Sequence, residues 1–439
     1  MIVKEPKKEY DVLVIGGGIA GMEASLTLGD MGFRVLLVEK TPSIGGKMAL
    51  LSKVFPTLDC SSCIVTPKMA AVQHHSNIDL MVLSEVSEVI KRVKGDFDVT
   101  IRKKPTFVDI DKCTGCTWCE KVCPVVISDE FNFDLRGRKA AYIAFDIAVP
   151  KKAVIDIDNC LLCGICESIC PADAINFLDT EKIFRIRVKT IIVATGYKLF
   201  DPREKTEFKY GKFRNVITSI QLDRLLAPTS PFGGVARPLD FKEPEKIAFL
   251  LCVGSRDLKI GYPLCSQVCC MYSIKQAQLV LGALPLAETT IFYIDIRAFG
   301  KGFEEFYNQS KLMGVRFVKG QVDMLKEKED GSICISYFDY ESGEMKNEKF
   351  DLVVLAVGFR PQNEIVNAFK NAKLELDEYG WIKVIDPNRS PNSTSIPGVF
   401  VAGTASGPKD IPDSILDANS AAMAAAKYIR KLERGGAGV

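Results

Sequence analysis

Cysteine spacing defines the chemistry available to this 439-residue chain, which contains 15 cysteines. Two runs repeat the pattern Cys-x₂-Cys-x₂-Cys-x₃-Cys-Pro, and this pattern is typical of chains that bind a pair of 4Fe–4S cubes. Three closely spaced thiolates can hold one face of a cube. The fourth cysteine lies too far along the chain to close the same cube, so it is expected to ligate the other one. The predicted ligands are Cys113, Cys116, Cys119 and Cys170 for the first cluster, and Cys160, Cys163, Cys166 and Cys123 for the second.

Zinc is the alternative ligand, because Cys-x₂-Cys pairs also bind Zn²⁺. Zinc sites rarely use three cysteines at two-residue intervals, and the doubled Cys-Pro ending favours the clusters. Such clusters carry single electrons. The sequence is therefore expected to contain another redox group that supplies or accepts those electrons.

A glycine-rich turn near the N-terminus predicts where that group binds. Residues 11–15 read as a buried strand, and a helix is expected from about residue 20 to residue 31. Between them, Gly16, Gly18 and Gly21 occupy the G-x-G-x-x-G frame of a dinucleotide-binding unit. The first glycine permits a tight turn, the second lets a pyrophosphate approach the backbone, and the third lets the helix pack closely.

The surroundings of this turn strengthen the dinucleotide prediction. N–H groups at the start of the helix, near Ile19 and Ala20, can face the phosphates together with the positive end of the helix dipole. Residues 33–38 read as the next strand, and Glu39 follows them, where it can accept hydrogen bonds from ribose hydroxyls. A tight turn without a ligand is the alternative, but both strands and the acid argue against it.

Further segments resemble flavoproteins with two dinucleotide domains, the relatives of thioredoxin reductase. The stretch from Glu39 through Gly45-Gly46 resembles the part of that family that runs along FAD, so the resemblance implies FAD, with NAD in this site as the alternative. In that family an acid follows the last glycine, where this chain has Gly403-Thr404. The residues that the resemblance assigns to FAD are Lys40, Gly45, Gly46, Lys47, Val86, Ala194, Thr195, Gly196, Gly403 and Thr404.

A second α/β unit is expected to begin near residue 246. Residues 246–253 read as a strand, and Gly254 stands alone after it. Relatives of thioredoxin reductase carry an NADPH glycine turn at this point, but this chain has no second G-x-G-x-x-G there. The sequence therefore predicts the scaffold of a nucleotide domain without its phosphate turn.

Four more cysteines lie where that turn would be: Cys252, Cys265, Cys269 and Cys270. Four thiolates within 19 residues can close one tetrathiolate site. Adjacent cysteines are unusual for a cube, so spacing alone leaves a cluster, zinc and buried thiols open.

A closer resemblance bears on these four cysteines. The runs at residues 252–257, 265–275, 297–302 and 407–412, together with Asp59-Cys60-x₂-Cys63 and its Pro67-Lys68-Met69, resemble HdrA, the A-type subunit of heterodisulfide reductase. In that family the four cysteines would ligate a non-standard 4Fe–4S cluster near the flavin. The resemblance also implies FAD-based electron transfer, in some members electron bifurcation, within a multisubunit cytoplasmic complex.

Three more residues receive a catalytic role in this interpretation. The resemblance places Lys275 near flavin N5, whereas a solvated helix lysine is the alternative. Cys60 and Cys63 have three open interpretations: ligands of a cluster shared with a partner, a redox disulfide, or packing thiols. In length, the chain resembles the shorter relatives, such as the A-type subunit of the quinone-interacting membrane-bound oxidoreductase.

Composition excludes other classes of function. Lys and Arg number 57 and Asp and Glu 55, a balance that gives no support for nucleic-acid binding. Two histidines leave little room for histidine metal sites, and the cysteine usage suits a reducing cytoplasm. We see no signal peptide and no apolar run of about 18 residues, so membrane contact is expected only through a partner.

The predicted fold class is α/β, with two Rossmann-like three-layer domains and an inserted α+β ferredoxin domain. The FAD domain comprises residues 1–105, 181–245 and 361–439, the insert residues 106–180, and the degenerate NAD(P)H-like domain residues 246–360. This organisation predicts an oxidoreductase subunit that converts between paired and single electrons. Its expected partners are other heterodisulfide-reductase-like subunits and an electron donor or acceptor protein, and a homodimeric core is a further expectation.

Two functions of other classes are the alternatives. One is a self-contained NAD(P)H oxidoreductase resembling the small subunit of glutamate synthase, and the missing second glycine motif weighs against it. The other is a docking scaffold whose clusters are only structural, which reduction of the clusters through the flavin would exclude.

Overall fold

The computed structural model describes residues 2–93 and 95–434, and its chain forms two compact units. The first unit comprises Met1–Ala49, Ile64–Tyr197 and Pro361–Val439, and the second comprises Leu50–Cys63 and Lys198–Arg360. In the described residues, no helix is both long enough and apolar enough to cross a membrane.

A seven-stranded sheet forms the centre of the first unit, in the order β3-β2-β1-β10-β5-β4, with β20 also paired to β10. The strands are β1 (Glu9–Ile15), β2 (Val35–Val38), β3 (Ile78–Met81), β4 (Ser84–Lys91), β5 (Phe97–Lys103), β10 (Lys182–Val193) and β20 (Val399–Val401). β1, β2, β3, β20 and the end of β10 run parallel, whereas β4 and β5 pair antiparallel. The parallel strands are almost continuously buried, as expected where both faces of a sheet are covered.

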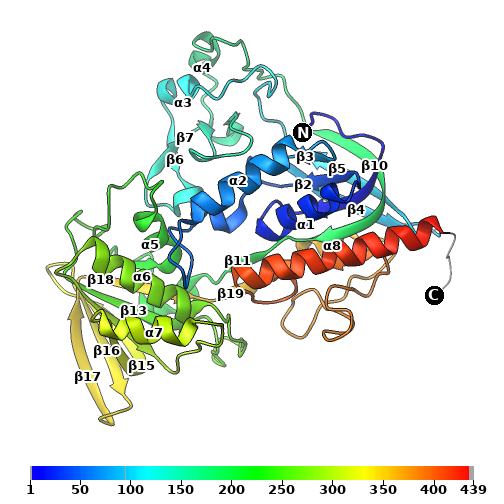
Figure 1. The fold of residues 1–439 in the computed structure, drawn as a ribbon. Helices are drawn as coiled ribbons and strands as arrows, with labels where there is room; N and C mark the ends of the chain where they lie inside the picture. Colours follow the sequence, from blue (N-terminus) through cyan, green and yellow to red (C-terminus); the bar gives the residue numbers. More distant parts are fainter. Residues whose placement is uncertain (1, 94, 435–439) are drawn as a thin grey trace. The chain divides into compact units, whose positions relative to one another are not determined.

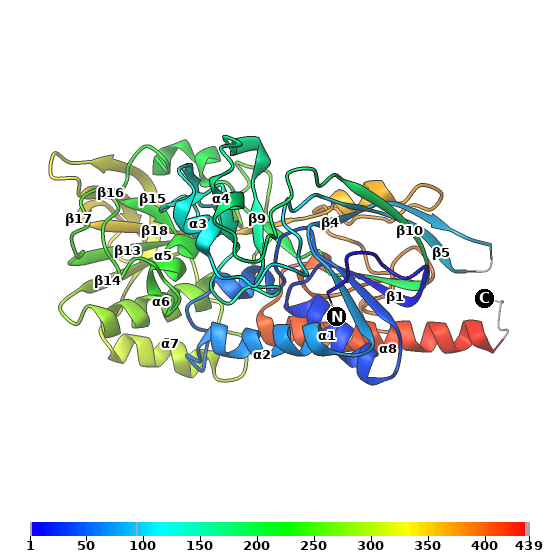
Figure 2. The same ribbon diagram turned by 90° about the horizontal axis from the view of Figure 1, so that it is seen from above.

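Helices α1 (Ile19–Asp30) and α8 (Ile411–Glu433) run side by side in this unit (Figure 1 and Figure 2). Buried alanines on α8, such as Ala418 and Ala422, let the two helices approach closely. The Asp410 side chain caps α8 by accepting a hydrogen bond from Asp413 N. Another helix, α2 (Ser61–His74), precedes β3 in the chain.

The cysteine-rich insert occupies the chain between β5 and β10 and belongs to the same unit. It contains α3 (Trp118–Val122), α4 (Ile165–Ser168) and two small hairpins, β6 (Val126–Ser128) with β7 (Gly137–Lys139) and β8 (Ala141–Ile143) with β9 (Ala153–Ile155). Its core buries Cys113, Cys119, Cys123 and Cys166 among alanine, valine, isoleucine and phenylalanine side chains. Hydrogen bonds join it to residues 43–44, from Ile44 N to Val149 O at 3.0 Å and from Val149 N to Ser43 Oγ at 2.8 Å.

The second unit has its own seven-stranded sheet, in the order β12-β18-β13-β14-β15-β16-β17. The strands are β12 (Val216–Thr218), β13 (Lys246–Val253), β14 (Glu288–Tyr293), β15 (Arg316–Glu327), β16 (Ile333–Asp339), β17 (Glu344–Phe350) and β18 (Leu352–Val357). The first five in the sheet order are parallel and the last two antiparallel. α6 (Cys269–Ala283) packs on β13, β14 and β18, and it lies beside α7 (Phe303–Leu312), as Figure 1 shows; α5 (Ser219–Leu226) packs on β18 and α6.

The division of the chain differs from the predicted boundaries at two places. Residues 198–245 were expected in the FAD domain, yet they belong to the second unit, because β12 pairs in parallel with β18. Leu50–Cys63 also joins the second unit. The first difference arises from a strand pairing and the second from contacts such as the hydrogen bond of Ser52 Oγ to Asp223. Both join segments far apart in the chain, which local sequence patterns do not reveal.

Candidate functional site

The glycine-rich turn connects β1 to α1, as the sequence predicts. A Cβ atom on Gly16, whose φ is +109°, would lie 2.3 Å from Ala194 O, and one on Gly21 would lie 1.8 Å from Gly16 O. Sterics inside the protein therefore require both glycines. A Cβ on Gly18 would meet no atom within 4 Å, so the protein itself does not demand glycine there. Open space beside the second glycine of this motif fits the approach of a pyrophosphate.

Glu39 follows β2 and lies against this turn. Its Oε2 accepts a hydrogen bond from Gly17 N at 2.6 Å, and its Oε1 accepts from Thr41 N and Thr41 Oγ1, each at 2.8 Å. The carboxylate is buried and held in place by three donors. It is thus fixed beside the loop that the sequence assigned to a dinucleotide.

Two other predicted FAD segments meet the turn. Gly45 N donates to Gly17 O at 2.8 Å, and a Cβ on Gly46 would lie 2.8 Å from Gly18 Cα. From the other end of the chain, a Cβ on Gly403 would lie 2.6 Å from Ala20 Cβ. The structure therefore brings together backbone segments that lie more than 350 residues apart in the sequence.

The remaining predicted FAD residues occupy different positions. Thr195 and Gly196 follow β10, and a Cβ on Gly196 would lie 3.8 Å from Thr404 Oγ1. Lys40 is exposed after β2, and Val86 is buried in β4. Direct contact of each of these side chains with FAD stays a prediction.

Sequence reasoning missed one acid beside the last glycine. Asp417 of α8 accepts a hydrogen bond from Gly403 N at 2.8 Å through Oδ2, and its Oδ1 accepts from Asn392 Nδ2 at 2.7 Å. A carboxylate therefore lies at this turn although Thr404 replaces the acid of the family pattern. Its only sequence signal is a charged residue in an alanine-rich helix.

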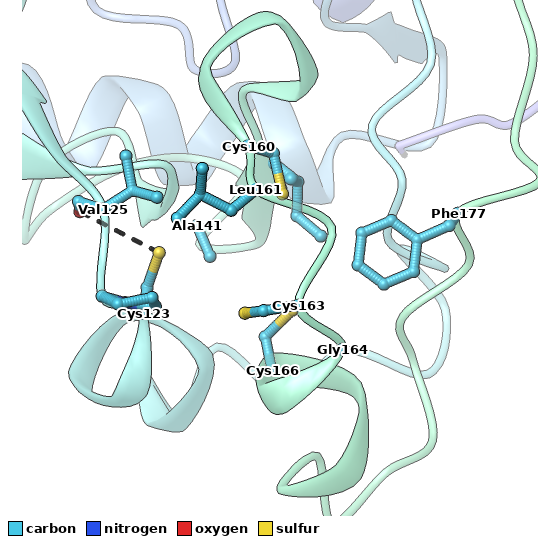
Figure 3. Close-up of a pocket in the computed structure, with 11 residues that line it drawn as sticks. Cys123, Val125, Ala141, Cys160, Leu161, Cys163, Gly164, Cys166 and Phe177 are labelled. Atoms are coloured by element: carbon cyan, nitrogen blue, oxygen red, sulfur yellow. Dashed lines mark hydrogen bonds between the residues drawn. The ribbon is translucent and has the colours of Figure 1, made fainter.

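Cys123 lies with the second cysteine run, although it belongs to the first in sequence. One cavity of about 320 Å³, including the part open to solvent, is bordered by Cys123, Cys160, Cys163 and Cys166 (Figure 3). The rest of its wall is uncharged: Pro124, Val125, Ala141, Ile155, Leu161, Gly164 and Phe177. Four thiols within an apolar wall are a donor set that fits a 4Fe–4S cube.

Cysteines of the other predicted set lie in or against the same core. Burial raises the pKa of the Cys119 thiol to about 12, with smaller contributions from Cys113, Cys116 and Cys166 nearby. Cys170 packs against the same core, and its Sγ accepts a hydrogen bond from Ala174 N at 3.3 Å. Because cluster binding needs thiolates, such a buried site must release protons when it is loaded.

The third set of cysteines gathers at the end of β13 and the start of α6. Burial raises the pKa of Cys252 to about 12 and raises that of Cys269 further, and the neighbouring thiols Cys265 and Cys270 add to both shifts. Within residues 2–93 and 95–434, no three His, Cys, Asp or Glu side chains are arranged to hold a single metal ion. Whether these four thiols hold a cluster stays a prediction.

A charged pair that the sequence did not single out flanks this third set. The Arg256 guanidinium pairs with both carboxylate oxygens of Asp295, one of them at 3.0 Å from Nη2. Arg256 lowers the pKa of Cys252 against the larger raising effect of burial. A cation beside these thiols favours their ionised form.

The turn after β13 is occupied by aromatic side chains. A Cβ on Gly254 would lie 2.2 Å from the Phe200 ring, and the Arg360 guanidinium lies 4.7 Å from the centroid of that ring and 3.7 Å from that of Tyr262. In nucleotide-binding units this turn faces the pyrophosphate. Here the space next to Gly254 is filled from within the same unit.

Lys275 is buried in the second unit, so the alternative of a solvated helix lysine is wrong. Its side chain is 2% exposed, and Nζ donates to Asp223 Oδ1 at 2.6 Å and to Lys53 O at 3.0 Å. Ser52 Oγ and Gln276 Nε2 also donate to Asp223, at 2.5 and 2.7 Å. The predicted flavin segments belong to the first unit, so contact between Lys275 and the flavin stays a prediction.

Cys60 and Cys63 lie at the start of α2. Cys63 N donates a hydrogen bond to Cys60 Sγ at 3.3 Å, and the Cys63 side chain is exposed. A side-chain hydrogen bond with Cys60 raises the pKa of Cys63. All three interpretations of this pair remain open.

Comparison with known families agrees with this geometry. A family model described as FAD dependent oxidoreductase matches residues 11–71, one described as 4Fe-4S dicluster domain matches residues 109–174, and one described as pyridine nucleotide-disulphide oxidoreductase matches residues 286–429. These matches confirm the expected oxidoreductase class and support FAD and 4Fe–4S as cofactors. The number of clusters stays a prediction.

Solved structures show the fold. Thioredoxin reductase from Lactococcus lactis superimposes with a TM-score of 0.54 over 96% of this chain and 99% of its own, at 16% identity. The enzyme from T. acidophilum gives a TM-score of 0.53 over the same shares, at 17% identity. The predicted α/β fold class, with its inserted ferredoxin-like domain, is confirmed.

Two curated sequences share a much higher identity with this chain than those two solved structures do. The second A-type iron-sulfur subunit of CoB–CoM heterodisulfide reductase from Methanopyrus kandleri is 48% identical over 94% of this chain. The A-type subunit of the H₂:CoB–CoM heterodisulfide,ferredoxin reductase from Methanothermobacter thermautotrophicus is 45% identical over the same share. The aligned region spans 63% of the length of each of these two relatives. Over 94% of its length, this chain is therefore a homologue of HdrA, the A-type subunit of heterodisulfide reductase.

Proposed function

We propose that this chain is the FAD- and iron–sulfur-containing electron-transfer subunit of a heterodisulfide-reductase-like complex. The observation that carries the proposal is that one compact unit contains both the glycine-rich turn and the two cysteine runs, with Cys123 of the first run lying beside the second. Bound FAD exchanges electrons in pairs or singly, and 4Fe–4S clusters carry them one at a time.

The residues of the first unit have distinct tasks in this proposal. Glu39 fixes the turn by accepting from Gly17 N, and Gly18 leaves the backbone open to a pyrophosphate. The wall around the second cysteine set is uncharged, so it offers the thiolates no competing ion-pair partner. The two redox sites lie in one compact unit, and hydrogen bonds between Val149 and residues 43–44 join the insert to the predicted flavin segment.

The proposal extends to the third cysteine set and to the partners. We infer that Cys252, Cys265, Cys269 and Cys270 ligate a further 4Fe–4S cluster. The expected partners are other heterodisulfide-reductase-like subunits and a protein that donates or accepts electrons. The expected location of this complex is the cytoplasm. The proposal also includes electron bifurcation, in which one two-electron donor reduces two acceptors of different potential.

A reductive titration tests whether the cofactors exchange electrons. The anaerobically purified chain is reduced stepwise, and flavin absorbance and the paramagnetic signals of reduced clusters are followed together. We expect the clusters to become reduced in the same titration as the flavin. Clusters that stay oxidised while the flavin is fully reduced would support a structural scaffold instead.

A further inference from the structure

Lys47 occupies a distinctive place in the first unit. It lies in the short 3-10 helix η1 (Gly46–Leu50), directly after the glycine that packs against Gly18 Cα. Its ammonium lies 4.7 Å from the ring centroid of Tyr197, which follows the Ala194-Thr195-Gly196 segment. The side chain therefore bridges two of the segments that surround the dinucleotide turn.

The surroundings of Lys47 provide little negative charge. Among the ion pairs of the described part of the chain, none includes Lys47. Burial lowers the pKa of Lys47 to about 8, the nearby Lys40 lowers it further, and Glu39 opposes both. The Glu39 carboxylate is already held by Gly17 and Thr41. Tyr197 offers the face of its ring, which attracts a cation more weakly than a carboxylate does.

We propose that Lys47 is the cation that neutralises the pyrophosphate of bound FAD. The inference rests on the proposed function, because it assumes that FAD occupies the glycine turn. The pyrophosphate is favoured over the isoalloxazine because Lys47 follows Gly46, whose backbone meets Gly18, and the second glycine of this motif is where a pyrophosphate approaches.

This role gives FAD affinity a definite pH dependence. An anion next to the ammonium raises the pKa of Lys47, so binding is strongest while Lys47 carries its proton. Affinity should be constant below about pH 7 and should fall as pH rises through and above the pKa of the unliganded protein, which is about 8. A charge-assisted contact of this kind corresponds to about a tenfold change in the dissociation constant.

Anaerobic calorimetry of the FAD-depleted full chain tests the inference. FAD and, separately, ADP are titrated between pH 6.5 and 9.5, because ADP carries the pyrophosphate without the flavin. We expect both affinities to fall by about tenfold across this range. Lys47→Met should bind about tenfold more weakly at pH 6.5 and lose the pH dependence, whereas Lys47→Arg should stay tight throughout.

Tyr197→Phe is the matched control for the aromatic ring beside Lys47. It retains the aromatic ring and removes the hydroxyl, so the fall in affinity should persist. A Lys47→Met profile that parallels wild type would overturn the inference, as would a Lys47→Arg profile that falls with pH as wild type does. A pH dependence seen with FAD but not with ADP would also overturn it, because the pH-dependent contact would then be with the flavin ring and not with the pyrophosphate. Failure of wild type to bind FAD at any pH would instead contradict the proposed function.

Discussion

The buried pair between Lys275 and Asp223 should dominate the local stability of the second unit. Both side chains are almost completely buried, at 2% and 3% exposed. Lys275→Met leaves the Asp223 carboxylate without its counter-charge, and removing one partner of a buried pair costs about 3–5 kcal/mol. Ser52 and Gln276 still donate to that carboxylate in the variant, so we expect the lower end, about 3 kcal/mol.

Hydrogen exchange read by mass spectrometry measures this effect where it arises. Lys275 contacts Lys53 O, and Asp223 lies on α5, so protection should fall in residues 50–63, 219–226 and 269–283. A loss of about 3 kcal/mol corresponds to roughly 100-fold faster exchange through local opening. The apolar double variant Asp223→Leu with Lys275→Met should recover most of the loss, because well-packed apolar replacements of buried pairs are often neutral.

An exposed pair in the same unit provides the control. Lys349 and Asp330 are also 2.6 Å apart, but their side chains are 58% and 56% exposed. Lys349→Met should leave the exchange of its strand unchanged, because solvent already screens that pair. Wild-type exchange rates in the Lys275→Met single variant would refute the reasoning, as would a double variant that is no more protected than the single one.

The turn after β13, the second cysteine run and Lys275 each provide a further prediction. NADPH should not bleach the flavin rapidly, because Phe200 fills the space beside Gly254; fast bleaching by micromolar NADPH would show a working nucleotide site. Cys123→Ala should expose the second cysteine run to alkylation while Cys113 stays protected; labelling of Cys113 instead would show that the ligands are not crossed. If Lys275 contacts the flavin, Lys275→Met should lower the flavin midpoint potential, by about 60 mV for each 1.4 kcal/mol in a one-electron step; midpoints within about 10 mV of each other would exclude that role.

Local patterns in the sequence predict the sites that rest on neighbouring residues. The glycine turn needs only a strand, three glycines and a helix, and the helix begins at Ile19, within one residue of the expected start. The cysteine runs likewise carry their ligand spacing within 11 residues each. The spacing also predicts that Cys123 lies too far along the chain to ligate the cluster of its own run. In the structure, Cys123 borders the cavity of the second run.

Partners far apart in the chain could not be predicted in this way. The Lys275–Asp223 pair joins two helices through residues that lie 52 positions apart, and neither side chain has a sequence signal of burial. Val216-Ile-Thr218 is too short a strand to reveal that it pairs with β18. Asp417 reaches Gly403 because α8 packs against η7 (Gly403–Ser406). Each of these contacts depends on tertiary packing rather than on periodicity.

Cofactor stoichiometry tests the central claim most directly. The chain is purified anaerobically, and iron, acid-labile sulfide and FAD are measured for wild type, Cys252→Ala and Cys334→Ala. Cys334 lies in β16, outside every proposed cluster, so its variant is the control for losing one thiol. The account predicts one FAD and about twelve irons per chain for wild type and the control, and about eight for Cys252→Ala. About eight irons in wild type would show that the third cluster is absent, and about sixteen would implicate Cys60 and Cys63 in a fourth cluster. A chain that contains neither FAD nor clusters would contradict the account.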